Sequence, residues 1–93
     1  MTLKELFTDE SRWTQGCFAR DAEGNEVGLE DPAAVKFCLA GGVLLCYLFG
    51  ERKGVSRVVN KIITHVGHSI PTWADSPERT FADIKRLINE LDI

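Results

Sequence analysis

Two short segments of this 93-residue chain combine polar and aromatic residues in a way that no packing pattern requires. The first is Trp13-Thr14-Gln15-Gly16, which runs on into Ala19-Arg20-Asp21 (segment 13–21). The second is Ile70-Pro71-Thr72-Trp73-Ala74-Asp75, which runs on to Arg79-Thr80 (segment 70–80). Tryptophan beside arginine and an amide is a typical composition of a protein-binding hot spot. We therefore expect a binding surface formed by Trp13, Gln15, Arg20, Asp21, Trp73, Asp75 and Arg79.

The same residues also have a purely structural interpretation. A loop tryptophan often covers a small hydrophobic core, and this role is favoured slightly for both tryptophans. General acid–base catalysis by Asp21 or Asp75 would need a carboxyl group with a raised pKa. The neighbouring Arg20 and Arg79 favour the ionised form instead. Ion pairs or helix caps that hold the loops are therefore the preferred roles of these carboxylates.

Cys38 is the candidate nucleophile of the chain. Together with Gln15, a histidine (His65 or His68) and Asp75, it follows the order Gln, Cys, His, Asp found in papain-like hydrolases. This chemistry needs the thiol at a helix N-terminus and beside a histidine, where its pKa is lowered. The helix expected here begins about seven residues before Cys38, where the helix dipole no longer acts. A buried core thiol is thus preferred, with a cysteine-dependent hydrolase or transferase as the alternative.

A metal site or a cofactor site is not expected. His65 and His68 could be joined by Cys17 or Asp75, but Gly67 is expected to end the helix between the two histidines. Structural zinc needs four ligands, and the chain contains no Cys-x-x-Cys pair. No motif diagnostic of a cofactor occurs in the sequence.

Composition indicates one globular domain over residues 1–93, with 44% hydrophobic and 27% charged residues. The formal net charge is −3 and no dense basic cluster occurs, so nucleic acid is not expected as a partner. A short basic run is interpreted as a solvated helix face; it comprises Arg52, Lys53, Arg57 and Lys61.

The apolar residues and the cysteines indicate where in the cell the protein is expected. The longest uncharged apolar run, residues 37–49, is shorter than the roughly 20 residues that a membrane-spanning helix needs. The charged N-terminus does not resemble a secretory signal peptide. Three cysteines leave an odd thiol, which favours reduced thiols in the cytoplasm. We expect no membrane partner and a cytoplasmic location.

The elements that must position these residues are mostly helical. Local signals predict an α+β domain in which about four helices pack around a central apolar helix, with one small β-hairpin near the N-terminal end. Thr2 and Glu5 form a capping box for a first helix that ends near Trp13. Residues 17–20 and 26–27 are expected to pair around a turn at residues 21–25.

The central helix is expected over residues 32–49. Asp31-Pro32 is a strong helix start, and Gly50 supplies the stop. Gly41 and Gly42 each cost roughly 1 kcal/mol in a helix relative to alanine, which suggests that a backbone or an aromatic ring approaches closely there.

Two further helices are expected after the central one. Apolar residues from Val55 to Val66 recur with a helical period, and Gly67 follows as a C-terminal cap. Thr80 with Asp83 marks the start of the last helix. The segment from residue 68 to residue 79 is expected to be a loop.

At these residues the sequence resembles a family of small uncharacterised proteins of bacteria and their phages. The resemblance spans most of the chain and rests on short motifs: Trp13-Thr14-Gln15-Gly16, Ala19-Arg20-Asp21 with Gly24, the stretch from Cys38 to Gly41, Trp73-x-Asp75, and Arg79-Thr80. The chain departs from the pattern at Ala74, where asparagine is expected. The resemblance implies a phage or bacterial accessory protein and brings no activity with it.

We therefore expect a non-enzymatic accessory protein that binds an unidentified protein partner. The surface around Trp13, Arg20, Trp73 and Asp75 is the expected binding site. A structural homodimer formed through the valine–isoleucine helix at residues 55–66 is a further alternative.

Overall fold

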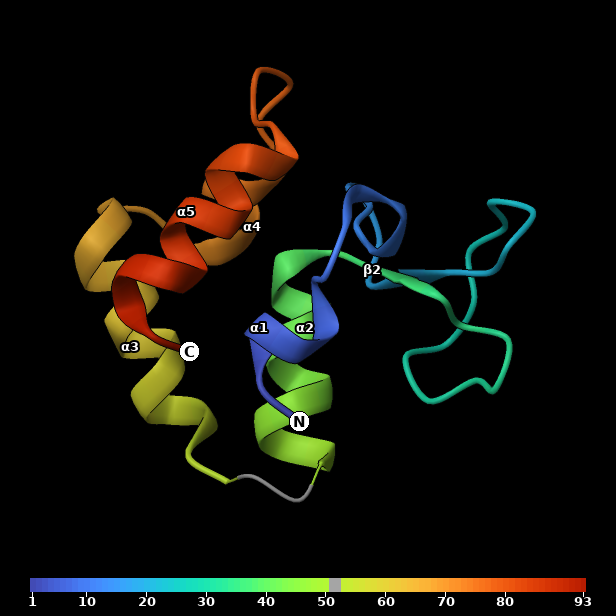
Figure 1. The fold of residues 1–93 in the computed structure, drawn as a ribbon, viewed down its shortest axis with the longest axis horizontal. Coiled ribbons are helices and arrows are strands. Elements are labelled where there is room, and N and C mark those ends of the chain that lie inside the picture. Colours follow the sequence, from blue (N-terminus) through green and yellow to red (C-terminus); the bar gives the residue numbers. More distant parts are fainter. Residues whose placement is uncertain (51–52) are drawn as a thin grey trace.

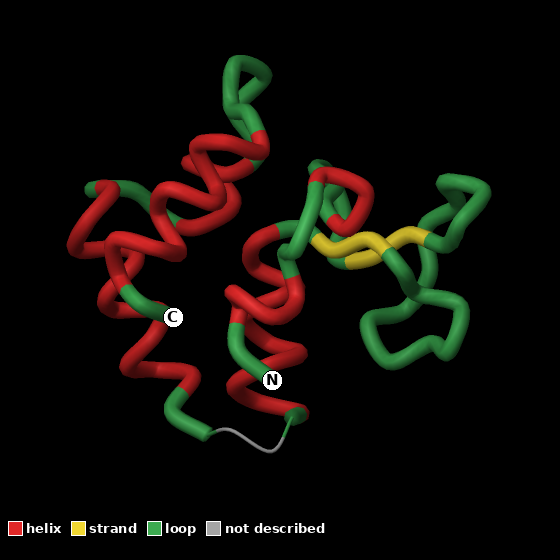
Figure 2. The backbone as a smooth tube through the Cα atoms, viewed as in Figure 1, coloured by secondary structure: helices red, strands yellow, loops and turns green. Residues whose placement is uncertain are grey.

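Helices dominate the computed structural model, which describes residues 1–50 and 53–93; Arg52 of the basic run lies outside this part. The described elements are α1 (Leu3–Leu6), the 3₁₀ turn η1 (Glu10–Arg12), β1 (Ala19–Arg20), β2 (Lys36–Phe37), α2 (Leu39–Leu44), the π-helical turn η2 (Leu45–Phe49), α3 (Val55–Val66), α4 (Ile70–Ala74) and α5 (Phe81–Leu91). The predicted α+β, mostly helical fold is confirmed (Figure 2). In Figure 1, α3, α4 and α5 lie on one side of α1 and α2, and the strands lie on the other.

The first helix forms with the predicted capping box. The Thr2 hydroxyl accepts a hydrogen bond from the Glu5 N–H, and the Glu5 carboxylate accepts one from the Thr2 N–H. The helix ends at Leu6, earlier than predicted, and the separate turn η1 continues the chain toward Trp13. Asp9 caps η1, which explains the break: its side chain binds the N–H of the next turn.

The β-structure forms with a different second strand from the one predicted. The turn at residues 21–25 is present, and Arg20 forms an isolated antiparallel bridge with Glu26. The strand that pairs fully with β1 is β2, antiparallel, with Ala19 opposite Phe37. In Figures 1 and 2 the residues between the two strands extend away from the helices as loops.

The predicted start of the central helix at Asp31-Pro32 is wrong. Asp31 makes a single turn, in which its carboxylate accepts the Ala33 N–H (2.8 Å) and its carbonyl accepts the Ala34 N–H (3.0 Å). The chain then becomes extended, because the Val35 N–H binds the Arg20 carbonyl (2.9 Å) and β2 follows. Strand pairing thus overrides a local helix-start signal. Helical structure begins at Leu39 and ends before Gly50, as predicted for the stop.

The two central glycines meet close neighbours, as predicted. A Cβ atom on Gly41 would lie 2.4 Å from the Phe18 carbonyl oxygen, and a Cβ atom on Gly42 would lie 2.7 Å from the Phe7 ring. The first contact brings the loop before β1 directly against α2. The second lets α1 approach α2.

The C-terminal half of the chain contains one helix more than predicted. Helix α3 and its cap at Gly67 (φ 76°) are confirmed, as is the Thr80–Asp83 capping box that starts α5. Part of the expected loop instead forms α4, with Ser69 as its N-cap and Pro71 in its first turn. Segment 70–80 thus begins with α4 and ends at Thr80, the N-cap of α5.

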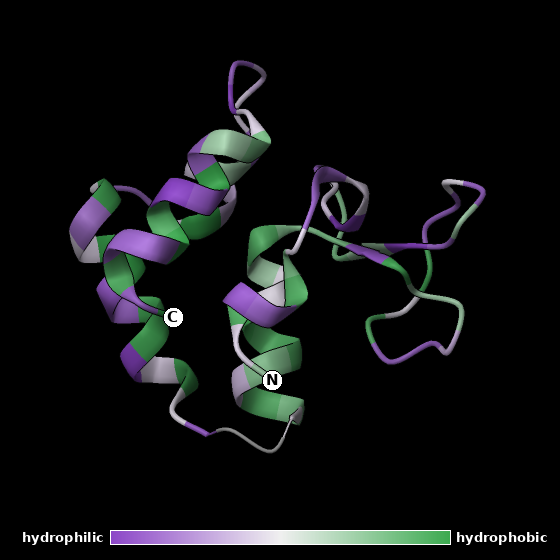
Figure 3. Cartoon of the chain, in the orientation of Figure 1, coloured by the Kyte–Doolittle hydropathy of each residue, from purple (hydrophilic) through white to green (hydrophobic). Residues whose placement is uncertain are grey.

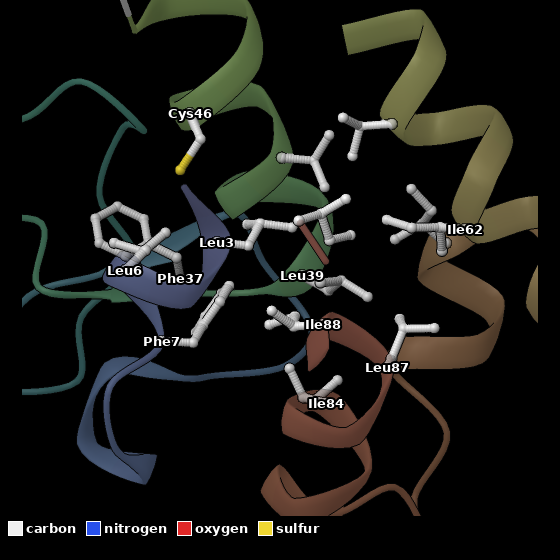
Figure 4. Close-up of a cluster of buried hydrophobic side chains, with 14 of the residues drawn as sticks. Leu3, Leu6, Phe7, Phe37, Leu39, Cys46, Ile62, Ile84, Leu87 and Ile88 are labelled. Atoms are coloured by element: carbon white, nitrogen blue, oxygen red, sulfur yellow. The ribbon is translucent and has the colours of Figure 1, made fainter. Parts of the chain in front are cut away.

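The core lies between α1, α2, α3 and α5 (Figure 4). Fully buried side chains include Leu39 of α2, Ile62 of α3 and Ile84 of α5. Figure 3 shows α2 as apolar over most of its surface, whereas α3 and α5 have one polar and one apolar side. Among the described residues, no helix is both long and apolar enough to cross a membrane.

Candidate functional site

The Gln15 side chain joins the two polar-aromatic segments. Its amide nitrogen donates to the Ala74 carbonyl (2.7 Å) and to the Ser76 carbonyl (3.0 Å). Ala74 is the last residue of α4, where backbone acceptors have no partner within the helix, and Ser76 lies in the loop just after it. The two segments, about 60 residues apart in sequence, therefore meet in space.

The Arg20 guanidinium holds its own loop together. Its Nε donates to the Thr14 hydroxyl (2.9 Å), one Nη to the Gly24 carbonyl (3.0 Å) and the other to the Gln15 carbonyl (3.3 Å). Asp21 shapes the adjoining turn, because its carboxylate accepts the N–H groups of Glu23 and Asn25. Both side chains are thus engaged with neighbouring residues.

Arg79 plays the equivalent part in segment 70–80. Its guanidinium lies 4.1 Å from the centre of the Trp73 ring, and its Nε donates to the Trp73 carbonyl (2.9 Å). One Nη also lies 3.7 Å from the Asp83 carboxylate. Stacking and hydrogen bonding together fix the loop between α4 and α5.

Trp13 joins segment 13–21 to the start of α5. Its ring centre lies 6.2 Å from that of Phe81 at the start of α5, with the two planes at 43°. The indole N–H is buried and has no hydrogen-bond partner among the described residues. We call the assembly of Trp13, Gln15, Arg20, Trp73 and Arg79 the polar frame.

A pocket of about 310 Å³ opens beside the polar frame. The lining residues come from both segments, from the start of α2 and, with Glu26, from the end of the turn after β1. They are Gly16, Cys17, Phe18, Glu26, Cys38, Ala40, Pro71, Ala74 and Asp75. Phe18 is 54% exposed, so an aromatic ring stands in solvent beside the pocket. Ala74, where the resembling family suggests asparagine, is buried and lines the pocket with a small apolar side chain.

Cys38 lies at a different place in its helix from the one predicted. It is the N-cap of α2, and its sulfur accepts the Gly41 N–H (3.1 Å). Its side chain is nevertheless buried. Burial raises the pKa of the Cys38 thiol, the Gly41 N–H opposes this, and the nearby Asp75 charge adds to the rise. The thiol is therefore protonated near neutral pH, unlike an activated nucleophile.

The other two thiols differ in accessibility. Cys17 is partly exposed on the pocket wall, whereas Cys46 lies in the core. Burial raises the pKa of Cys46 to about 11. All three cysteines are free.

The structure does not bring the two histidines into this pocket. Neither His65 nor His68 is among its lining residues. The His65 ring instead lies 3.0 Å from the Glu90 carboxylate, which links α3 to α5. Among the described residues no group of three or more potential ligands is arranged to hold a metal ion.

Asp75 and Glu26 are the free acids of the pocket. Both are exposed, and no hydrogen bond or ion pair of either carboxylate occurs within the described part of the chain. The pocket lining includes no lysine, arginine or histidine. Sequence reasoning selected Asp75 but missed Phe18 and Glu26, because a half-exposed phenylalanine and a loop glutamate carry no local signal of their place in the fold.

Comparison with known proteins gives one match. A family of unknown function (DUF6197) matches residues 3–91, which is nearly the whole chain. Neither a curated protein nor a solved structure matches it.

Proposed function

The chain belongs to this family of unknown function (DUF6197), and we propose its role from the site: a non-enzymatic accessory protein of a bacterium or phage that binds another protein. The binding face consists of the pocket and its rim, with Phe18, Glu26 and Asp75 as the residues that contact the partner. We place this protein in the cytoplasm, because three free thiols suit a reducing compartment.

One observation carries the proposal: a phenylalanine that is 54% exposed stands beside a pocket whose walls are held by hydrogen bonds between distant segments. An aromatic anchor on a preformed surface is typical of binding sites, because little conformational freedom is lost on association. The free carboxylates of Glu26 and Asp75 add polar groups at the rim.

Most of the residues that the sequence assigned to partner binding have a structural role in this proposal. Gln15, Arg20 and Arg79 direct donors at backbone carbonyls, so we assign them to holding the pocket rather than to the partner. Of the residues expected to bind, Asp75 is the one that we retain as a direct contact. We assign Trp13 and Trp73 to the frame as well, because Trp13 packs against Phe81 and the Trp73 ring lies under the Arg79 guanidinium.

Selection of peptides from a displayed random library tests this function. Binders selected on the wild-type protein should lose at least about tenfold in affinity for Phe18→Ser, since aromatic anchors dominate interface energies. Ile63→Ser is the matched control: Ile63 is also an exposed apolar residue (39%), but it lies on α3, outside the pocket lining. Binders that are equally sensitive to both changes, or no binders at all, would contradict the proposal.

A cysteine-dependent enzyme is the second candidate, favoured by the place of Cys38 at a helix N-cap and on the pocket wall. The raised pKa of the Cys38 thiol argues against this candidate, because it lowers the fraction of reactive thiolate. Alkylation with iodoacetamide at about pH 6 separates the two, because the reaction rate follows the thiolate fraction. One fast-reacting thiol at Cys38 would support the enzyme, and three slow thiols would support the binding protein.

A further inference from the structure

We infer that the pocket receives a basic side chain of the partner protein, a lysine or an arginine whose alkyl stem enters between Phe18 and Pro71. This inference rests on the proposed function and names the chemistry of the contact. The pocket itself is the starting point, because its size, its walls and its charge each restrict the occupant.

The size suits a single side chain. A volume of about 310 Å³ lies at the lower end of the range for small-molecule sites, roughly 300–1,000 Å³. It is large enough for one long side chain. On one side the Phe18 backbone packs closely on α2, since a Cβ atom on Gly41 would lie 2.4 Å from the Phe18 carbonyl oxygen and the Cys38 N–H binds that oxygen (3.2 Å).

The walls suit an alkyl stem. Phe18, Ala40, Pro71 and Ala74 present carbon atoms to the pocket, and the Cys38 thiol behind them is protonated near neutral pH. Long basic side chains commonly lay their methylene groups on apolar surface while the charged head stays near polar groups. A small polar ligand would leave these carbon walls unused.

The charge selects a cation. Asp75 and Glu26 both line the pocket, and neither carboxylate has an ion-pair partner in the described residues. No lining residue is basic, so nothing in the lining compensates the two negative charges. A cation in the pocket is attracted by both carboxylates, whereas an anion is repelled.

The field of Asp75 reaches the inner wall of the pocket. Cys38 and Asp75 both line the pocket, and the Asp75 charge adds to the rise in the pKa of the Cys38 thiol that burial causes. A field that disfavours a thiolate favours an ammonium or guanidinium group in the same space.

Titration with small probes tests the pocket directly. Nα-acetyl-lysine methylamide and Nα-acetyl-arginine methylamide are added to ¹⁵N-labelled protein, and amide chemical shifts are followed by NMR. The neutral norleucine derivative is the matched control for the stem. Shifts should concentrate at Gly16, Cys17, Phe18 and Asp75, and we expect affinity for the cationic probes about tenfold above that for norleucine.

The acids are tested by a matched pair of variants. Asp75→Asn combined with Glu26→Gln should reduce binding of the cationic probes about tenfold, whereas Glu30→Gln removes a charge outside the pocket lining and should leave it unchanged. The thermal melting temperature of each variant shows that the fold is intact. Equal affinity for norleucine and lysine probes, or no effect of the double change, would overturn the inference.

The two proposals fail in different ways. Peptide binders that depend on Phe18 but contain no basic residue would support protein binding and refute the basic anchor. The same holds for binders whose affinity is unchanged by the double acid variant. Cationic probes that bind in the pocket without any selected peptide would refute protein binding instead. Weakening of peptide binding as salt rises to about 0.5 M would support the basic anchor, since surface charges are screened at that concentration.

Discussion

The core and the polar frame are stabilised by different interactions. In the core, apolar side chains of α1, α2, α3 and α5 pack together, and the described residues include no buried polar or charged residue. In the frame, Gln15, Arg20 and Arg79 donate hydrogen bonds to backbone carbonyls. Apolar packing is non-directional and grows with buried area, whereas hydrogen bonds fix distances and angles.

This difference separates stability from pocket shape. The core supplies most of the free energy of folding, because burial of apolar area is the dominant favourable contribution. The frame supplies geometry, since its donors fix the positions of backbone carbonyls, including that of Ala74, which lines the pocket. Changes in the core should therefore lower stability strongly, and changes in the frame should alter binding at a smaller cost in stability.

Two adjacent isoleucines of α3 give the largest expected contrast. Ile62 is fully buried and Ile63 is 39% exposed. Ile62→Ala should lower the free energy of unfolding by about 3 kcal/mol through lost burial and the cavity left behind. Ile63→Ala should change it by about 0.5 kcal/mol or less. Urea unfolding of both variants measures this, and similar losses would show that the core does not lie where we place it.

Gly41 marks the contact between α2 and Phe18, which precedes β1 and lines the pocket. Gly41→Ala should cost about 2 kcal/mol, because the new Cβ would lie 2.4 Å from the Phe18 carbonyl oxygen and neither backbone can yield freely. The change should also alter the pocket, which Phe18 lines. Thermal unfolding and NMR shifts at the pocket residues measure the two effects.

Gly28→Ala is the control for this substitution. Nothing lies within 4 Å of a Cβ atom built on Gly28. The melting temperature of the Gly28→Ala variant should therefore match that of the wild type. An equally mild effect of Gly41→Ala would mean that β1 can shift away from α2 at little cost.

Gln15 tests whether the frame contributes geometry more than stability. Gln15→Ala removes two hydrogen bonds and should cost about 1–2 kcal/mol, less than the core change at Ile62. Gln15→Glu keeps the shape but cannot donate, and it should destabilise at least as much. Urea unfolding provides the measurement. If Gln15→Glu leaves the free energy of unfolding unchanged, the hydrogen bonds of the Gln15 amide do not hold the two segments together.

The smallest expected effect is a pH dependence at the start of α5. The Thr80 N–H bond, with help from Arg79 and Arg86, holds the pKa of Asp83 below its ordinary value of 3.8. A lowered folded-state pKa stabilises the fold fully at higher pH, and this contribution is lost as pH falls below 3.8 and through the folded pKa. The melting temperature should fall less between pH 5 and pH 3 in Asp83→Asn than in the wild type. Equal slopes would contradict the role of this carboxylate.

Some elements were predictable because their signals are local. The capping boxes at Thr2 and Thr80 and the cap at Gly67 involve contacts within one helical turn, and each forms as predicted. The helix start at Asp31-Pro32 was wrong for the complementary reason. Its local signal competes with strand pairing between residues 20 and 35, which sequence periodicity does not reveal.

The candidate site divides in the same way. The polar-aromatic segments identified Gln15 and Asp75 as unusual residues, and the close contacts at Gly41 and Gly42 were predicted from the cost of glycine in a helix. The exposure of Phe18 and the approach of Glu26 to the pocket depend on how β1 and its turn lie against α2. No spacing along the chain encodes that placement.

By itself, the sequence determined the mostly helical class, the helix caps and the apolar face of α3, because these follow from residues three or four positions apart. The tertiary structure alone decided that Cys38 caps a helix, that Gln15 reaches α4, and that two unpaired acids share one pocket. The last two features join residues about 50 to 60 positions apart. The place of Cys38 at the helix start depends on strand pairing, in which the Cys38 N–H binds the Phe18 carbonyl (3.2 Å). Such contacts are set by packing of the whole chain, and packing depends on every element at once.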